Sequence, residues 1–331
     1  MTLLKVENLT LQFDTDEGRI TCVNDVSFEV NAGEVLGVVG ESGSGKSITA
    51  KSIMHLNARN AVYSPESSIK LSLDDGLVDV FSLKHDRDLK VVRGGAVSMI
   101  FQEPMASFAP ALTIGDQMIE QLQIHKGITK KEAVNLSIEM LERVGISDAP
   151  HRFKQYAFEL SGGMRQRAMI AMALSTGPKL LIADEPTTAL DVTIQAQVID
   201  LMKDLVEDFG MGIIFITHDL GVIAQTADRV AVMYLGNIIE QGSVRDVIRN
   251  PAHPYTKGLL DALPKLDDLD TPLTPVPGDI PSPLERPSGC VFHTRCSLAE
   301  PRCSQSAPQM TKFSKNHIGA CFVEAEIRGA V

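Results

Sequence analysis

The stretch Gly40-Glu-Ser-Gly-Ser-Gly-Lys-Ser47 decides the fold, because it follows the apolar run Glu34–Val39 and precedes a helical segment at about residues 45–56. A short apolar run that ends in glycine is typical of a buried strand. Glycines let consecutive backbone N–H groups turn inward at a helix N-terminus, where they hold phosphate groups. This context distinguishes the full G-x-x-x-x-G-K-S/T pattern from a glycine-rich turn. The stretch predicts a triphosphate site made of Gly40, Glu41, Ser42, Gly43, Ser44, Gly45, Lys46 and Ser47.

Four side chains are expected to carry the chemistry of this site. Lys46 is expected to reach the β- and γ-phosphates, and the Ser47 hydroxyl to bind Mg²⁺. The strand Leu180-Leu-Ile-Ala-Asp-Glu185 ends in two carboxylates. We expect Asp184 to hold Mg²⁺ through water and Glu185 to orient or deprotonate the attacking water.

A second anion site is predicted at the start of another helix. The string Leu160-Ser-Gly-Gly-Met-Arg-Gln166 exposes backbone N–H groups at a positive helix end. A lone Ser-Gly-Gly is usually a helix cap, but this string resembles the signature of ABC ATPases. In that family the signature binds the γ-phosphate of ATP held by the opposing subunit. The resemblance implies this role for Ser161, Gly162, Gly163 and Gln166.

The other motifs of the ABC family are also present, in the order typical of the family. Gln102, in Phe-Gln-Glu-Pro, resembles the Q-loop glutamine that senses Mg²⁺ and water, and Asp191, in Ala-Leu-Asp, resembles the D-loop. His218, in Ile-Thr-His-Asp, resembles the switch histidine that contacts the γ-phosphate, although a single histidine after a strand is more often structural. Phe13 is the candidate for stacking on adenine, with a core position as the alternative. The resemblance thus implies Glu185, His218 and Gln102 as catalytic residues, and Ser47, Gln102 and Asp184 as magnesium ligands.

The order of strands and helices fits the same family. Leu3–Phe13 and Thr21–Val30 alternate apolar and polar residues, and strands and helices alternate after residue 180. The resemblance implies an α/β fold, a P-loop ABC ATPase cassette with a RecA-like core, an antiparallel β subdomain and a helical signature subdomain. We expect the nucleotide-binding domain to span residues 1–250, with its helical insert at about 103–175. Residues 251–331 are expected to form a C-terminal extension.

Four strings narrow the resemblance to the ATP-binding subunits of dipeptide and oligopeptide importers: Val39–Ser47, Leu190–Gln197, Asn250–Gly258 and Val276–Pro283. An ATPase coupled to transmembrane import is therefore expected. Its implied partners are a second, related ATPase subunit, two membrane permeases and an extracytoplasmic solute-binding protein. Relatives in this branch also serve nickel and oligosaccharides. Residues 57–95 and Tyr156-Ala-Phe-Glu depart from the usual pattern of the branch, so these solutes remain alternatives.

The C-terminal extension combines a proline-rich strap with a cluster of cysteines. Residues 264–287 contain seven of the 17 prolines, too many for a packed helix or central strand. Four of the five cysteines follow, and such a cluster indicates a metal in a reducing compartment. The resemblance implies a 4Fe–4S cluster on Cys290, Cys296, Cys303 and Cys321. Tetrahedral zinc and unligated thiols are the alternatives.

Composition argues against a nucleic-acid ligand. The formal net charge is −11, from 31 basic and 42 acidic residues, whereas phosphate backbones reward clustered Lys and Arg. A soluble ABC ATPase acting on DNA or ribosomes is the remaining alternative, although the chain has one cassette and no heptad run. No apolar run reaches a membrane-spanning length and no signal peptide is recognisable. We therefore expect a peripheral protein on the cytoplasmic face of the inner membrane.

Overall fold

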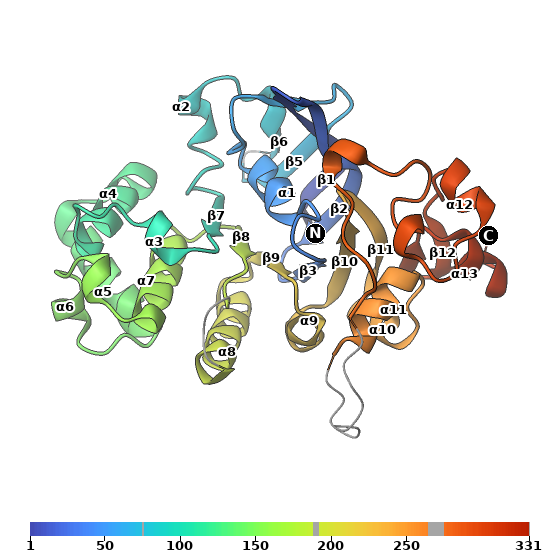
Figure 1. Cartoon of the computed structure of the whole chain (residues 1–331). Coiled ribbons are helices and arrows are strands. Elements are labelled where there is room, and N and C mark those ends of the chain that lie inside the picture. Colours follow the sequence, from blue (N-terminus) through green and yellow to red (C-terminus); the bar gives the residue numbers. More distant parts are fainter. Residues whose placement is uncertain (75, 188–191, 264–274, 331) are drawn as a thin grey trace. The chain divides into compact units, whose positions relative to one another are not determined.

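The computed structural model describes residues 1–74, 76–187, 192–263 and 275–330 (Figure 1). These residues form two compact units. Unit 1 comprises Met1–Leu4, Val30–Glu34 and Lys70–Ile216, and unit 2 comprises Lys5–Glu29, Val35–Ile69 and Thr217–Val331.

Parallel strands form the core of unit 1. Their order is β7 (Val97–Ile100), β8 (Leu180–Asp184) and β9 (Gly212–Thr217). Every residue of the three strands is buried, which explains why each is a continuous apolar run rather than an alternating one. The apolar runs Val97–Phe101, Leu180–Ala183 and Ile213–Thr217 predict three buried strands here, and the structure confirms them.

The helical periodicity of residues 113–175 predicts three helices that begin near Ile114, Lys130 and Ser161, and the structure confirms these three starts between β7 and β8. Thr113 accepts a hydrogen bond from the Asp116 N–H at the start of α4, and Thr129 forms a capping box with Glu132 at the start of α5. Figure 1 shows α4, α5 and α7 gathered in one bundle. The segment comprises α3 (Pro104–Ser107), α4 (Ile114–Lys126), α5 (Lys130–Arg143), α6 (Ala149–Arg152), η2 (Ala157–Glu159) and α7 (Gly162–Ser175).

The segments Ile69–Leu73 and Val78–Leu83, around Asp74-Asp75-Gly76, predict a hairpin, and the structure has one whose second strand ends earlier than expected. Its strands are β5 (Ser68–Leu73) and β6 (Gly76–Asp79), with Leu73 opposite Gly76. The second strand was expected to reach Leu83. Instead, the Asp79 carboxylate accepts a hydrogen bond from the Phe81 N–H and caps a 3₁₀ turn. The other elements of unit 1 are η1 (Val80–Ser82), α2 (Asp86–Leu89) and α8 (Val192–Phe209).

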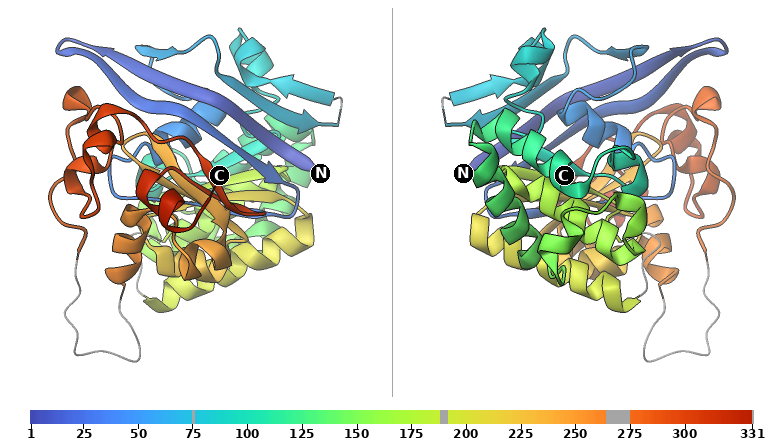
Figure 2. Two further views of the ribbon diagram at one scale, coloured as in Figure 1. Left: turned by 90° about the vertical axis from the view of Figure 1, so that its right-hand side faces the viewer. Right: turned by 90° about the vertical axis from the view of Figure 1, so that its left-hand side faces the viewer.

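Unit 2 contains most of a long antiparallel hairpin and a second group of strands. Figure 2 shows the neighbouring strands β1 (Thr2–Thr15) and β2 (Gly18–Asn31) running side by side. The short β4 (Ala61–Tyr63) pairs with β1, placing Phe13 opposite Ala61. In the second group, β3 (Val35–Val39) lies parallel to β10 (Arg229–Tyr234), and β10 pairs antiparallel with β11 (Asn237–Ser243).

The end of the chain extends this second group of strands. Strand β13 (His317–Gly319) pairs antiparallel with β11, and β12 (Thr311–Ser314) pairs with β13. The buried His317 Nε2 lies 2.7 Å from Glu240 Oε1 on β11. The change in composition after Asn250 suggests a separate small unit, but strand pairing joins residues 317–319 to β11. The domain boundary at residue 250 stays a prediction.

The helices of unit 2 are mostly short. They are α1 (Lys46–Ile53), α9 (Leu220–Thr226), α10 (Val244–Arg249), α11 (Pro254–Asp261), η3 (Pro283–Glu285), η4 (His293–Arg295), α12 (Pro301–Gln305) and α13 (Phe322–Ile327). Within the described ranges, no helix combines the length and the apolar character needed to cross a bilayer.

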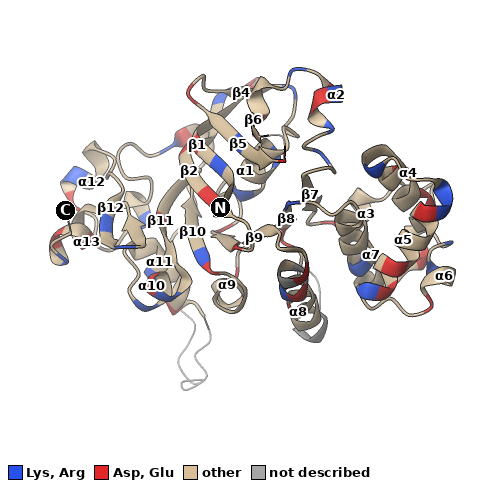
Figure 3. Cartoon of the chain, turned by 180° about the vertical axis from the view of Figure 1, so that it is seen from behind, with Lys and Arg blue, Asp and Glu red and all other residues tan. Residues whose placement is uncertain are grey.

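Opposite charges lie close together on the helices of both units. Figure 3 shows acidic and basic residues interspersed over α4 and α5 of unit 1, and it shows basic α12 beside acidic α13 in unit 2. Arg302 on α12, for example, forms ion pairs with Glu300 and Glu326. Such charges compensate one another locally instead of forming one basic surface.

Candidate functional site

The predicted phosphate loop connects β3 to α1 in unit 2. Gly43 and Gly45 have φ angles of +79° and +97°, which favour glycine. A Cβ atom on Gly40 would lie 2.1 Å from the Met233 carbonyl oxygen, and one on Gly45 would lie 2.7 Å from the Cys22 carbonyl oxygen. The glycines are therefore required both by backbone conformation and by close packing against the neighbouring strands.

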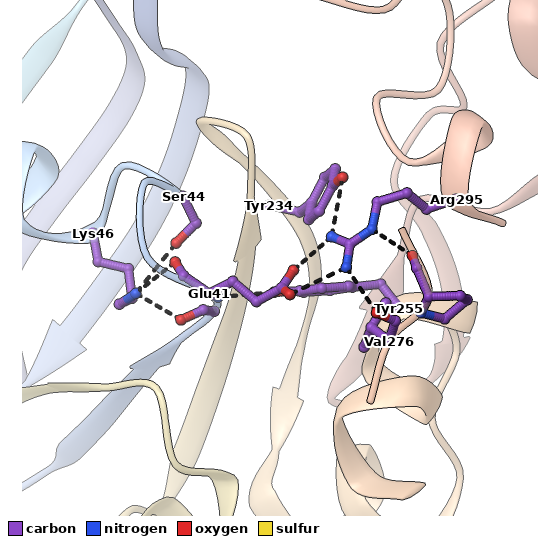
Figure 4. A network of polar contacts seen from close by, with 9 residues as sticks. Glu41, Ser44, Lys46, Tyr234, Tyr255, Val276 and Arg295 are labelled. Atoms are coloured by element: carbon purple, nitrogen blue, oxygen red, sulfur yellow. Dashed lines mark hydrogen bonds and ion pairs between the residues drawn. The ribbon is translucent and has the colours of Figure 1, made fainter. Parts of the chain in front are cut away.

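Lys46 lies across this loop (Figure 4). Its Nζ donates hydrogen bonds to the carbonyl oxygens of Gly40 at 2.6 Å and Glu41 at 3.0 Å, and to Ser44 Oγ at 3.3 Å. Lys46 and Ser44 are both buried. The loop thus surrounds a cationic side chain at the N-terminus of α1, an arrangement suited to binding phosphate groups.

In unit 1, the structure brings Gln102 and Glu185 together, although they lie 83 positions apart in the sequence. Asp184 ends β8 and is buried, and Glu185 follows it. Gln102 Nε2 donates a hydrogen bond to Glu185 Oε2 at 3.1 Å. Glu185 has a φ of +48°, and its N–H donates to the Ile216 carbonyl oxygen at 2.9 Å. A left-handed conformation in a residue other than glycine costs energy and often marks a functional position.

The predicted signature residues lie at the start of α7. Ser161 is the N-cap, and its Oγ accepts a hydrogen bond from the Met164 N–H at 3.3 Å. A Cβ atom on Gly162 would have no neighbour within 4 Å. Gln166 is buried and donates to the Pro186 carbonyl oxygen at 2.7 Å, so it connects α7 to the residues after Glu185.

Three further residues were predicted for the site: His218, Phe13 and Asp191. His218 follows β9 as an exposed residue of unit 2, and the next residue, Asp219, caps α9 by accepting from the Gly221 N–H at 2.7 Å. Phe13 is partly exposed on β1. Asp191, assigned to the D-loop, lies outside the described residues.

The four C-terminal cysteines line one narrow cavity in unit 2, together with His253, Pro254, His293, Leu298, Pro308, Phe322 and Val323. The four cysteines are free thiols. Burial, together with the charges of the other three, raises the pKa of the Cys290 thiol to about 11. Among the described residues, no three His, Cys, Asp or Glu side chains are arranged as a ready metal site. The cavity therefore gathers the predicted ligands without showing their coordination geometry.

Comparison with known proteins shows the family of this chain. The ABC transporter family model matches residues 23–188. The chain is 47% identical over 324 residues to OppD, an oligopeptide transport ATP-binding protein of Salmonella typhimurium, covering 98% of this chain and 94% of OppD. It is 48% identical over 325 residues to AppD, an oligopeptide transport ATP-binding protein of Bacillus subtilis, covering 98% of each. This chain belongs to the ABC transporter ATPase family.

Two further comparisons concern the C-terminal region and the fold. The model of the oligopeptide/dipeptide transporter C-terminal region matches residues 239–303. MJ0796, an ABC transporter cassette solved as a dimer, has a TM-score of 0.64 at 26% identity, covering 73% of this chain and 99% of the cassette. CbiO1 of Clostridium perfringens has a TM-score of 0.62 at 25% identity, covering 75% and 91%. The predicted α/β fold of an ABC cassette is confirmed, and the cysteine-rich unit stays a prediction.

Sequence reasoning missed several residues of the ABC ATPase that contact the phosphate loop. Arg295 forms an ion pair with Glu41, and the Tyr255 hydroxyl accepts a hydrogen bond from the Glu41 N–H. Tyr234 contacts the same arginine. In the sequence, Arg295 is marked only by its position next to Cys296. The residues around Arg295 do not identify Glu41, 254 residues earlier, as its partner.

Proposed function

We propose that this ABC ATPase powers an importer of dipeptides or oligopeptides. The match of residues 239–303 to the oligopeptide/dipeptide transporter C-terminal region carries this proposal. It is supported by the names of the relatives, OppD and AppD, which align over nearly the whole chain. Nickel or an oligosaccharide is the alternative solute, with the same role for the ATPase.

The proposed division of labour follows the motifs. Lys46 and the loop N–H groups bind the phosphates of ATP, and the Mg²⁺ that accompanies ATP is held by Ser47, Asp184 and Gln102. Glu185 orients or deprotonates the attacking water, and its hydrogen bond from Gln102 supports a link between water and the metal ligands. His218 contacts the γ-phosphate, and Phe13 stacks on adenine. The trans site consists of Ser161, Gly162, Gly163, Gln166 and Asp191.

We also propose that two ATPase subunits close face to face around ATP, with the phosphate loop of one subunit opposite the signature of the other. The partner would be a second, related ATPase subunit. Closure would act on two permeases, and an extracytoplasmic binding protein would deliver the solute. The solute itself would not touch this chain. The protein would accordingly lie at the cytoplasmic face of the inner membrane, held there by the permeases.

Uptake by cells tests the solute. A strain that lacks this chain is expected to lose ATP-dependent uptake of a labelled tripeptide, because the permeases cannot cycle without it. Wild-type protein should restore uptake, whereas Lys46→Ala, which lacks the phosphate-binding cation, should not. Uptake of nickel and of a labelled oligosaccharide is measured in the same cells. If the deletion abolishes uptake of nickel or of the oligosaccharide and leaves peptide uptake unchanged, that solute replaces peptides as the proposed substrate of the importer.

A metal centre on Cys290, Cys296, Cys303 and Cys321 is proposed as a structural staple of the extension, with a 4Fe–4S cluster preferred to zinc. The four free thiols line one cavity, which supports the proposal. Four thiolates suit either metal centre. Such a centre would link four separate points of the backbone, and its binding energy would become folding energy.

Metal analysis tests the identity of this centre. Anaerobically purified protein is expected to be brown, with absorption near ~400 nm and about four irons per chain. Cys303→Ser should lose most of the iron and be cleaved faster by proteases after residue 264. Cys22→Ser, which changes the one cysteine outside the cavity, should keep the iron content and the protease resistance of the wild type. One zinc per chain and no iron would establish the alternative, and wild-type iron content in Cys303→Ser would exclude this ligand set.

A further inference from the structure

The second residue of the phosphate loop is held through both its main chain and its side chain. The Glu41 N–H donates a hydrogen bond to the Tyr255 hydroxyl at 2.9 Å. The Glu41 carboxylate accepts two hydrogen bonds from Arg295, Nη1 to Oε2 at 2.7 Å and Nη2 to Oε1 at 3.2 Å (Figure 4). Two-point contact between a guanidinium and a carboxylate fixes direction as well as distance.

Arg295 is itself fixed by the C-terminal extension. Its Nε donates to the Pro277 carbonyl oxygen at 2.9 Å, and its Nη2 donates to the Val276 carbonyl oxygen at 3.1 Å. Nη1 also lies 3.4 Å from the Tyr234 hydroxyl. The Arg295 side chain is only 4% exposed, compared with 28% for Glu41. The guanidinium therefore has little freedom to follow Glu41 if the loop moves.

An aromatic cluster forms the support beneath this ion pair. Tyr234 on β10 and Tyr255 on α11 are fully buried, with ring centroids 4.8 Å apart. Phe292 of the extension lies 5.2 Å from the first ring and 5.4 Å from the second. Arg295 lies 5.7 Å from the Tyr234 ring and 5.9 Å from the Phe292 ring. Rigid rings packed in this way hold the side chain that in turn holds the loop.

The ion pair acts on the part of the loop that positions Lys46. The carbonyl oxygens of Gly40 and Glu41 both accept hydrogen bonds from Lys46 Nζ. Movement of Glu41 would displace these carbonyls and the adjacent N–H groups together. Small displacements of positioned groups are costly, since phosphate binding depends on several donors converging at one place.

We propose that Arg295 is a positioning residue for nucleotide binding, which holds the phosphate loop in its binding conformation through Glu41. This proposal rests on the proposed role of the loop in binding ATP. It assigns the C-terminal extension a task in the ATPase cycle: the extension sets the affinity of the loop for the β- and γ-phosphates without touching the nucleotide.

Titration of the full chain with a fluorescent ATP analogue and Mg²⁺ tests the proposal. Arg295→Met keeps the apolar stem but removes the charge, and is expected to raise the dissociation constant about tenfold, within the range of coupling between linked sites. Glu41→Gln should weaken binding similarly, and the double variant should be no weaker than the worse single variant. In the ATPase assay of the assembled transporter, KM for ATP should rise while kcat at saturating ATP is largely kept.

Arg302→Met is the matched control. Arg302 belongs to the same extension and also forms ion pairs, but its partners, Glu300 and Glu326, belong to the extension and not to the phosphate loop. This variant should bind ATP like the wild type. Circular dichroism confirms that each variant is folded. If Arg295→Met does not fold, Arg295→Lys replaces it, because it keeps the cation but loses the two-point contact and should weaken binding to a smaller degree.

Wild-type affinity in a folded Arg295→Met or Arg295→Lys variant would overturn the proposal. So would a double variant whose losses multiply, since the two residues would then act independently. Failure of the wild-type chain itself to bind ATP, or unchanged binding in Lys46→Ala, would instead overturn the assignment of the phosphate loop. The two failures are therefore distinguishable.

Discussion

Glu185→Gln is expected to bind ATP nearly as tightly as the wild type but to lose turnover. The amide has almost the same volume as the carboxylate, and Lys46, Ser47 and Asp184 remain available for the phosphates and Mg²⁺. However, the amide cannot take a proton from water, and the carboxyl oxygen that accepts a hydrogen bond from Gln102 Nε2 at 3.1 Å is lost. Loss of this assistance typically costs on the order of 10²–10⁴ in rate.

The measurement pairs a binding titration with ATP hydrolysis in the assembled transporter. Size-exclusion chromatography with ATP should show that the variant accumulates as a closed pair of ATPase subunits. Glu139→Gln is a suitable control, because Glu139 is an exposed carboxylate on α5 with no proposed role. Hydrolysis by Glu185→Gln at near the wild-type rate would show that another group acts on the water.

Gly162→Asp is expected to separate ATP binding from turnover in the opposite subunit. The side chain fits its own chain, since a Cβ on Gly162 has no neighbour within 4 Å, and a carboxylate at the N-terminus of α7 is favourable to the helix. The same carboxylate would occupy the anion position and repel the γ-phosphate of the partner's ATP. Turnover should fall by about 10²–10³, the typical cost of losing one donor to developing charge.

Binding of ATP to the variant's own phosphate loop should be unchanged. Gly162→Ala adds a Cβ without a charge and should lose much less activity. Pairing the Gly162→Asp chain, and separately the Lys46→Ala chain, with the wild-type partner ATPase subunit then tests which ATP each residue acts upon. If the purified chain hydrolyses ATP as a strict monomer, or if Gly162→Asp is fully active, the shared-site mechanism is wrong.

Local chemistry made the nucleotide motifs predictable. Gly43 and Gly45 have positive φ angles, and this preference belongs to the residues themselves rather than to distant partners. Helix α5 begins at Lys130 because Thr129 and Glu132 cap it from three residues apart. Continuous apolar runs predicted the buried strands for the same reason, since burial on both faces leaves no polar alternation. The family and its cassette fold therefore followed from the sequence.

The contacts between distant residues required the tertiary structure. Gln102 meets Glu185 because β7 and β8 lie side by side and parallel, so that the residues after their carboxyl ends share one edge. Arg295 meets Glu41, 254 residues earlier, because the later part of the extension packs against β10 and α11. The cysteine-rich segment likewise continues into β13, which pairs with β11. Sequence specifies turns, caps and buried runs through interactions a few residues long, whereas strand order and long-range packing decide which of the resulting side chains meet.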